Sequence, residues 1–135
     1  MSTNLETLGR AVKRAQHRQH RAVDTALAVI DTSIVQWDAL RAIDRAPGAS
    51  AHDLALATFQ SDQSFGTLAN RLEARGLIKR QSGEGRRIEH HLTSAGERKL
   101  REANVITEQV RAELFAPLTQ SDRRDLQRML DRLLG

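Results

Sequence analysis

The chain has 135 residues, with 21 Lys and Arg against 17 Asp and Glu, and this length fits one domain of ordinary size or one small domain with an extended oligomerisation element. The lack of cysteine excludes disulfides, thiolate metal sites and a thiol redox sensor, and the lack of a long apolar run or a signal-peptide pattern predicts a cytoplasmic protein without membrane contact. A net charge of +4 with only 3% aromatic residues favours duplex DNA as a partner over single strands, which need stacking rings.

The N-terminal third predicts two helices. Apolar residues recur at helical spacing in two groups on either side of a polar stretch over residues 13–21: Leu5, Leu8, Val12 and Val23, Leu27, Ile30. A helix that is polar on every side is normally solvated or bridges between parts of an assembly. A second helix is predicted over 34–45, and 46–48, with a proline and a glycine, end it. Its apolar face holds Ile34, Trp37, Leu40 and Ile43.

The next segment predicts two short helices joined by a few residues. Ser50 and Asp53 form a capping-box pattern that opens the first, and Ser61 is a cap for the second, expected over about 62–75. Gly76 supplies the stop after this second helix. Its inner face holds Phe65, Leu68 and Leu72 at helical spacing.

A hairpin and two helices complete the chain. Residues 77–80 and 88–92 are predicted to pair as strands around a turn at 82–85. Thr93 is predicted to cap a long helix to about Ala116, and Thr119 with Asp122 to open a last helix. We expect its apolar residues to face inward: Leu126, Met129, Leu130 and Leu133. The fold class is therefore mainly α with a small β-hairpin, and one hairpin cannot build a sheet enzyme.

The stretch from Ser50 to Arg87 carries the functional prediction. Once the core positions are removed, the second short helix presents short polar side chains and one arginine: Ser61, Gln63, Ser64, Thr67, Asn70 and Arg71. Such side chains reach base edges and phosphates when a helix enters the major groove. The hairpin holds four basic side chains against one acid, and arginine on a thin hairpin suits the narrow minor groove: Lys79, Arg80, Arg86 and Arg87. Either feature alone is more often a solvated surface, but the two in succession predict a winged helix-turn-helix.

Three segments resemble the MarR family of bacterial transcriptional regulators. They are the run from Leu72 to Arg80, then Glu84-Gly85-Arg86-Arg87, and then the run from Leu92 to Gly96. The combination L-E-x-x-G-L-I-x-R, a wing and L-T-x-x-G is fairly specific, whereas no one piece would be. The resemblance covers about residues 33–100, and the flanking helices have suitable lengths.

The resemblance implies a homodimer with interleaved terminal helices. Residues 1–32 and 94–135 would form the helical dimerisation region, and 33–93 the DNA-binding region, with a recognition helix at about 61–75 and a wing at about 81–88. The apolar pattern supports a dimer independently of the resemblance. The polar stretch over 13–21 separates Leu5, Leu8 and Val12 from any core of the same chain that could cover them, and the last helix has more apolar surface than a surface helix needs. A two-fold dimer would read a pseudo-palindrome with half-sites roughly 10 bp apart.

The resemblance also assigns contacts. Glu84-Gly85-Arg86 falls where the family usually has D-x-R, whose arginine reaches the minor groove and whose acid helps to fix the wing. Arg86 is therefore the expected minor-groove contact, with Arg87 beside it; this sequence has Glu for Asp and a wing about two residues shorter than usual. Base contacts are assigned to Gln63, Ser64 and Thr67. Phosphate contacts are assigned to the helix start near Ser61 and to Arg71, Arg75 and Lys79.

Many family members release DNA when a small aromatic ligand binds between the two regions. The candidates to line such an effector pocket are His17, His20 and Trp37. The sequence favours the alternatives, since Trp37 shares a stripe with Leu40 and Ile43 as a core anchor would, and the histidines lie among basic residues as on a solvated surface. A zinc site is not predicted, because His90 and His91 alternate on a strand and point to opposite faces. His90 shares a face with Ile88 and Leu92 and is expected to be packed or hydrogen-bonded behind the wing.

Catalysis has no support, because the carboxylates fall at helix-surface spacing with Arg and Lys, and no nucleophile elbow or phosphate-binding loop occurs. We therefore predict a sequence-specific duplex-DNA-binding regulator, a repressor rather than an activator, with no cofactor and no metal. Two alternatives stay open: a winged-helix protein-interaction module and a non-specific architectural DNA-binding protein.

Overall fold

The computed structural model describes residues 4–135. It forms six α-helices, one short 3-10 helix and one hairpin in these residues: α1 (Leu5–Leu27), η1 (Ala28–Ile30), α2 (Ile34–Arg45), α3 (Ala51–Ala57), α4 (Asp62–Ala74), β1 (Ile78–Ser82), β2 (Ile88–Leu92), α5 (Ser94–Leu114) and α6 (Gln120–Leu134). The predicted order of helices and hairpin is confirmed. No helix within residues 4–135 combines the length and apolarity that a bilayer crossing requires.

The helix starts follow from side chains that satisfy free backbone N–H groups. Ser33, Ser50, Ser61, Thr93 and Thr119 each accept a hydrogen bond from an N–H in the first turn of the helix that follows. The full reciprocal capping box is present at Thr119 and Asp122, as predicted. At α3 the Ser50 oxygen accepts from the Asp53 N–H, which is one half of the predicted box.

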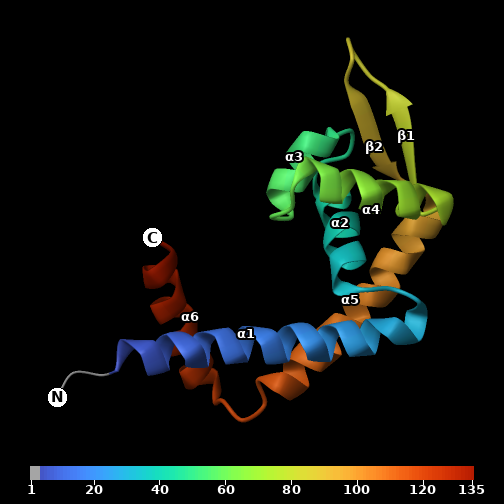
Figure 1. The fold of residues 1–135 in the computed structure, drawn as a ribbon. Coiled ribbons are helices and arrows are strands. Elements are labelled where there is room, and N and C mark those ends of the chain that lie inside the picture. The colour runs from blue at the N-terminus through green and yellow to red at the C-terminus, as the bar shows by residue number, and fades with distance from the viewer. Residues whose placement is uncertain (1–3) are drawn as a thin grey trace.

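The elements form two parts, a helix–hairpin lobe and an elongated base (Figure 1). The lobe contains α2, α3 and α4 with the hairpin projecting above them, and the base contains α1 packed on α5. The first helix is continuous from Leu5 to Leu27, so the polar stretch at 13–21 is one exposed segment of a single helix. The confirmed fold is mainly helical with a two-stranded antiparallel wing and packed terminal helices.

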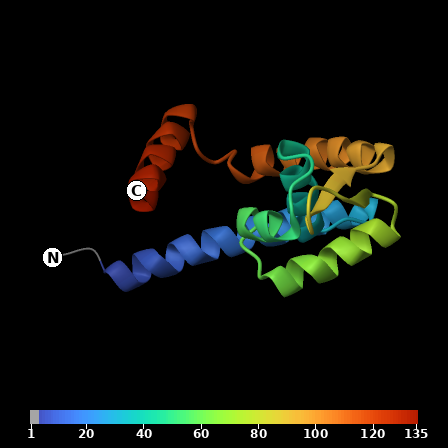
Figure 2. The same ribbon diagram turned by 90° about the horizontal axis from the view of Figure 1, so that it is seen from above.

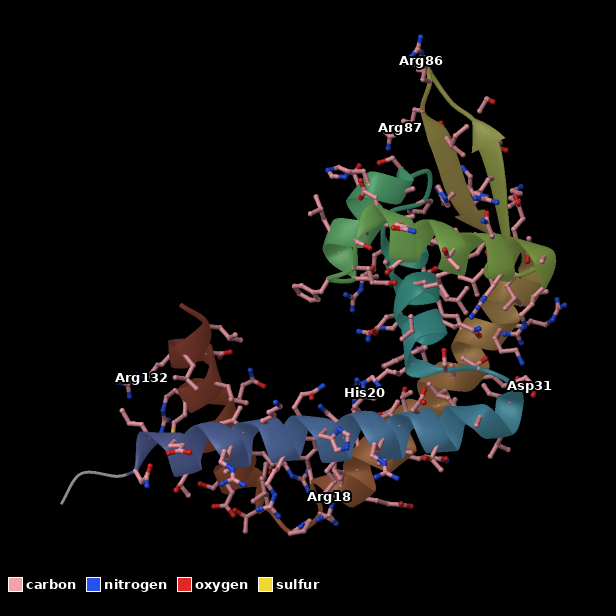
Figure 3. All side chains as sticks on the ribbon, viewed as in Figure 1. Arg18, His20, Asp31, Arg86, Arg87 and Arg132 are labelled. Carbon is pink, nitrogen blue, oxygen red and sulfur yellow. The ribbon has the colours of Figure 1, made fainter. Side chains whose placement is uncertain are left out.

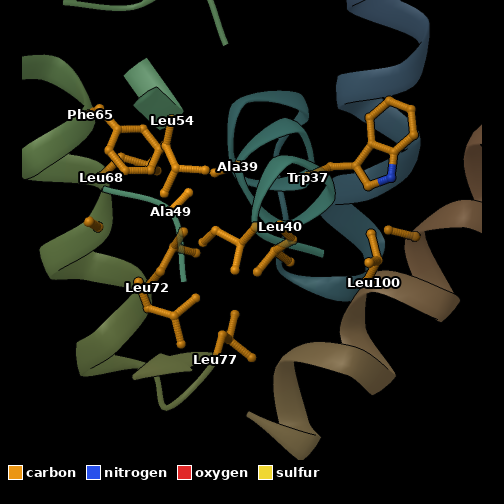
Figure 4. Close-up of a cluster of buried hydrophobic side chains, with 14 of the residues drawn as sticks. Trp37, Ala39, Leu40, Ala49, Leu54, Phe65, Leu68, Leu72, Leu77 and Leu100 are labelled. Carbon is orange, nitrogen blue, oxygen red and sulfur yellow. The ribbon is translucent and has the colours of Figure 1, made fainter. Parts of the chain in front are cut away.

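One apolar cluster holds the lobe together and joins it to α5 (Figure 4). Phe65, Leu68 and Leu72 are the buried face of α4, as their spacing predicts. They meet the buried residues of α2 and α3, and Leu100 of α5 extends the cluster toward the base. Burial of this cluster fixes the angle of α4 to the rest of the lobe.

Two glycines shape the junction between the lobe and α5. Gly76 has a φ of +75°, which glycine adopts without a steric penalty, and it ends α4 as predicted. Gly96 packs against the backbone of Leu77 so closely that a Cβ on Gly96 would overlap the Leu77 carbonyl oxygen. The Thr93 hydroxyl donates to the Gly76 carbonyl at 2.6 Å and accepts from the Gly96 N–H at 3.0 Å. The L-T-x-x-G motif therefore joins the end of α4 to the start of α5.

The prediction that the apolar residues of α6 face inward is wrong for a single chain. Helix α6 has no buried residue, and Met129 and Leu133 are 52% and 74% exposed. Figure 2 shows the reason, because α6 stands apart from α1 and from the lobe instead of packing on them. The N-terminal half of α1 is equally uncovered, with Leu5, Leu8 and Val12 exposed.

Candidate nucleic-acid interface

Helix α4 presents the polar face that its sequence predicts. The Ser61 oxygen accepts from the Ser64 N–H at 3.0 Å, so the helix begins with its first turn capped. Gln63, Ser64 and Thr67 are exposed, and the Thr67 hydroxyl donates back to the Gln63 carbonyl at 3.2 Å. The hydroxyl oxygen of Thr67 retains its capacity to accept, while the side-chain amide of Gln63 is free to donate and accept within the described part of the chain.

Two of the predicted contact residues on α4 are bonded within the protein. Asn70 accepts a hydrogen bond from the Arg80 guanidinium at 2.8 Å, and the same nitrogen of Arg80 lies 2.7 Å from the Glu73 carboxylate. Arg75, just beyond the helix, donates to the Gln36 side chain on α2 at 2.6 Å. Asn70 and Arg75 therefore hold α4 to its neighbours, whereas the Arg71 side chain makes no hydrogen bond or ion pair within residues 4–135.

The Arg80 contacts tie the wing to α4. Arg80 is in strand β1, opposite His90 in the register of the hairpin. Its hydrogen bond lowers the pKa of the Glu73 carboxyl, so Glu73 stays ionised and continues to accept from Arg80. From the sequence alone Arg80 is one of four basic residues of the hairpin, with no contact assigned to it. The only sign of its role is the acid seven residues before it, across the turn from helix to strand.

The two consecutive arginines of the wing point in different directions (Figure 3). Strands β1 and β2 pair from Ile78 with Leu92 to Ser82 with Ile88, so β1 extends two residues beyond the predicted 77–80. Arg86 projects from the tip, and Arg87 points back and donates to the Gly48 carbonyl at 3.1 Å. The structure therefore places Arg86 at the exposed tip of the wing, whereas Arg87 bonds the tip end of β2 to the loop before α3.

A different acid from the predicted one stabilises the wing. The Glu84 carboxylate makes no hydrogen bond or ion pair in the described part of the chain. Glu89 instead lies 3.0 Å from the His91 imidazole, and hydrogen bonds from His91 and Gln81 lower the pKa of its carboxyl. Lys79, which faces His91 in the register, is exposed and available for a phosphate.

His90 anchors the other face of the hairpin. It is 1% exposed, its Nδ1 lies 3.0 Å from the Ala49 carbonyl oxygen, and its ring meets Phe65 edge-on at 6.0 Å. The backbones of Ala49 and His90 also pair, so the loop before α3 adds a short third segment to the hairpin. The prediction that His90 is packed and hydrogen-bonded behind the wing is confirmed, and burial lowers the pKa of its imidazole.

The three residues predicted to line an effector pocket differ in how far they are buried. Trp37 is buried, and its indole N–H donates to the Asn104 side chain at 2.9 Å, while the Arg41 and Arg111 guanidinium carbons lie 4.3 and 5.0 Å from the ring centre. His20 is half-buried and points toward the lobe (Figure 3), close enough for its charge to act on Asp38. His17 is exposed on α1.

A groove of about 330 Å³ opens beside the C-terminal half of α2. It is lined by α2 and by the turn that joins α3 to α4: Asp38, Arg41, Ala42, Arg45, Ala46, Ala57, Thr58 and Phe59. Burial raises the pKa of Asp38, and Arg41 contributes a guanidinium both here and over Trp37. Within residues 4–135, no three His, Asp or Glu side chains are grouped as a metal site.

Comparisons with known proteins agree with this architecture. A family model described as the MarR family matches residues 30–88. The transcriptional repressor Rv2887 of Mycobacterium tuberculosis is 27% identical over 113 residues, which cover 82% of this chain and 81% of the relative. A crystal structure of Rv2887 with p-aminosalicylic acid, 26% identical, superposes with a TM-score of 0.78 over 95% of this chain and 98% of that one.

A second solved structure extends the likeness in fold. A mutant of MarR from E. coli, crystallised with operator DNA, superposes with a TM-score of 0.88 at 19% identity, over 96% of this chain and 94% of that chain. At this identity the likeness concerns the fold alone. It covers the terminal helices as well as the lobe.

Proposed function

Since this chain belongs to the MarR family of winged helix-turn-helix transcriptional regulators, which are not enzymes, we propose that it is a homodimeric repressor that binds a pseudo-palindromic duplex operator. The observation that carries the proposal is Arg86, which projects from the wing tip beyond the exposed polar face of α4 (Figure 3). A helix for the major groove and an arginine for the adjacent minor groove are then displayed together.

The proposed contacts follow from which side chains are free. Gln63, Ser64 and Thr67 would read base edges, and Arg86 would enter the minor groove. Ser61 at the helix start, Arg71 and Lys79 would contact phosphates. Asn70, Arg75 and Arg87, which bond to the protein, would contribute mainly by holding α4 and the wing in place.

Selection of bound duplexes from a random pool tests this function. A repressor of this kind enriches a pseudo-palindrome with half-sites roughly one helical turn apart, and its affinity falls steeply with salt. Arg86→Ala should weaken binding severalfold. Arg124→Ala is the control and should leave binding unchanged, because Arg124 is exposed on the side of α6 opposite its apolar residues. Absence of binding to any duplex at low salt would favour the protein-interaction alternative. Equal competition by random duplex would favour the architectural one.

The proposed dimer is supported by the uncovered terminal helices. Residues 1–32 and 94–135 would interleave with those of a second copy, which would cover Leu5, Leu8 and Val12 and the apolar side of α6. A groove of about 390 Å³ between α5 and α6, with Phe115, Leu126 and Leu130 in its lining, would receive the partner's helix. Sedimentation at micromolar concentration should give a dimer, and Leu130→Asp should give a monomer with weakened DNA binding.

We further propose a small aromatic acid as the effector. Rv2887 has been crystallised with p-aminosalicylic acid and with salicylic acid. In this chain the guanidinium groups of Arg41 and Arg111 lie over the Trp37 ring, so cations for a carboxylate and an indole for an aromatic ring lie together. His17 lies on the exposed surface and would contribute least.

Trp37 allows a direct test because the chain has one tryptophan. Titration with salicylate should change its fluorescence and release a bound duplex over the same concentration range. Arg111→Gln should weaken both effects, and Arg124→Gln, a matched surface change, should weaken neither. A fluorescence change without DNA release would contradict an effector role.

A further inference from the structure

Gly66 lies in the interior of α4, where neither the backbone conformation nor the packing of this chain requires a glycine. A glycine in a helix interior costs about 1 kcal/mol relative to alanine. The φ of Gly66 is not positive, and a Cβ added to it would meet no heavy atom within 4 Å. Gly96 is the contrasting case, since a Cβ there would overlap the Leu77 carbonyl. The space beside Gly66 is open from outside the molecule.

Gly66 lies in the middle of a row of residues on one side of α4. Residues four apart in a helix lie on the same side, so Asp62, Gly66 and Asn70 form a strip, with Glu73 beside its end. Asn70 and Glu73 accept from Arg80 of the wing. We call these four residues the wing-side strip of α4, because Arg80 bonds two of them to the wing.

The other end of the strip is bonded to α3. The His52 Nδ1 lies 3.1 and 3.2 Å from the two carboxylate oxygens of Asp62. Both side chains are about two-thirds exposed, so the carboxylate is held in orientation and still open to a partner. Each carboxylate oxygen has two acceptor positions, which leaves Asp62 free to accept again.

The charges of the strip favour a base edge over a phosphate. Asp62 and Glu73 are both acidic, and each is already bonded to a partner, His52 and Arg80 respectively. A carboxylate repels phosphate but accepts hydrogen bonds from the cytosine N4 amino group in the major groove. For such a bond the base must come within about 3 Å of its partner, and a helix can come that close where a side chain is absent.

We propose that Gly66 and Asp62 form a base-reading point. The missing side chain of Gly66 lets the edge of a base pair approach the backbone of α4, and Asp62 accepts a hydrogen bond from cytosine N4. His52 is a positioning residue that orients the carboxylate. This proposal rests on the proposed function, and it assigns specificity to a glycine and to an acid of the recognition surface.

Gly66→Ala separates this role from a structural one. The substitution should raise Tm, because alanine stabilises the helix and its Cβ meets nothing, and it should lower affinity for the selected duplex about tenfold or more. Gly66→Val should bind more weakly still. Gly9→Ala, at another helical glycine whose Cβ would meet nothing, controls for the change in Tm. Wild-type affinity in Gly66→Ala would overturn the proposal.

Asp62→Ala tests the base assignment. Wild-type protein should enrich a cytosine at one position of each half-site, and Asp62→Ala should lose the preference at that position while keeping the rest of the motif. Exchanging that pair for A·T should weaken wild-type binding roughly tenfold and leave Asp62→Ala unaffected. His52→Ala should reduce the discrimination without abolishing it. An unchanged motif in Asp62→Ala would overturn the proposal, whereas failure of the wild type to enrich any motif would refute the proposed function itself.

Discussion

The guanidinium of Arg80 lies 2.7 Å from the carboxylate of Glu73 and joins the wing to α4. The same nitrogen donates to Asn70 at 2.8 Å, so one side chain of β1 is bonded to two residues of α4 that are three apart. In the proposed complex α4 and the wing contact adjacent grooves together, and their relative position depends on this link.

Loss of Arg80 should therefore affect DNA binding more than folding. We expect Arg80→Ala to lower affinity for the selected duplex by tenfold or more, with little change in Tm, because the pair is partly exposed. Arg80→Lys should recover only part of the affinity, since an ammonium lacks the planar fork. Titration of the two variants and of Lys79→Ala, an exposed neighbour on β1, measures the difference. Equal losses in Arg80→Ala and Lys79→Ala would mean that charge alone matters.

Arg86 and Arg87 should separate into a DNA contact and an anchor. Arg86→Ala is expected to weaken DNA binding without altering amide hydrogen exchange in the hairpin. Arg87→Ala removes the bond to the Gly48 carbonyl, so exchange at the tip end of the hairpin should quicken. Exchange and affinity measured on both variants test the assignment, which fails if Arg87→Ala leaves exchange unchanged.

Gly96→Ala should destabilise the fold by about 1–3 kcal/mol or more, because its Cβ would overlap the Leu77 carbonyl oxygen and force α5 away from the lobe. Urea denaturation measures the change in the free energy of unfolding. Gly66→Ala is the matched substitution in another helix and should change stability in the opposite direction. Similar stability of the two variants would show that the junction can adjust.

Acid should destabilise the lobe through His90. Burial lowers the pKa of His90 below the ordinary 6.5, so as pH falls through that value the unfolded chain takes up a proton that the folded chain does not. The free energy of unfolding should therefore fall, by at most about 1.4 kcal/mol per pH unit from this group. Denaturation of wild type and His90→Gln between about pH 5 and pH 7.5 should show a smaller slope in the variant. Parallel pH profiles would exclude His90 as the source.

Local patterns made much of this fold predictable. The caps at Ser50, Ser61, Thr93 and Thr119 are short-range hydrogen bonds, and the buried face of α4 follows its helical spacing. The alternation of His90 and His91 across the strand was predictable for the same reason. Such features depend on neighbours within a few residues.

Features that depend on distant segments were not predictable. The bonds of Arg80 to Glu73, Arg87 to Gly48 and His52 to Asp62 cross between elements. Local sequence patterns therefore do not divide the basic residues into DNA contacts and anchors. The error at α6 has a related cause. The helical spacing of its apolar residues predicts that one face of α6 is buried. It does not tell whether the same chain or a second copy buries that face.

The measurement that tests the central claim most directly is a salt titration of binding to a selected duplex and to a scrambled duplex of equal length. We predict a tighter complex with the selected duplex at every salt concentration, and a linear fall of log affinity with log salt. Arg86→Ala should reduce the steepness of that fall. Equal affinity for the two duplexes, or no binding to either at low salt, would contradict the account.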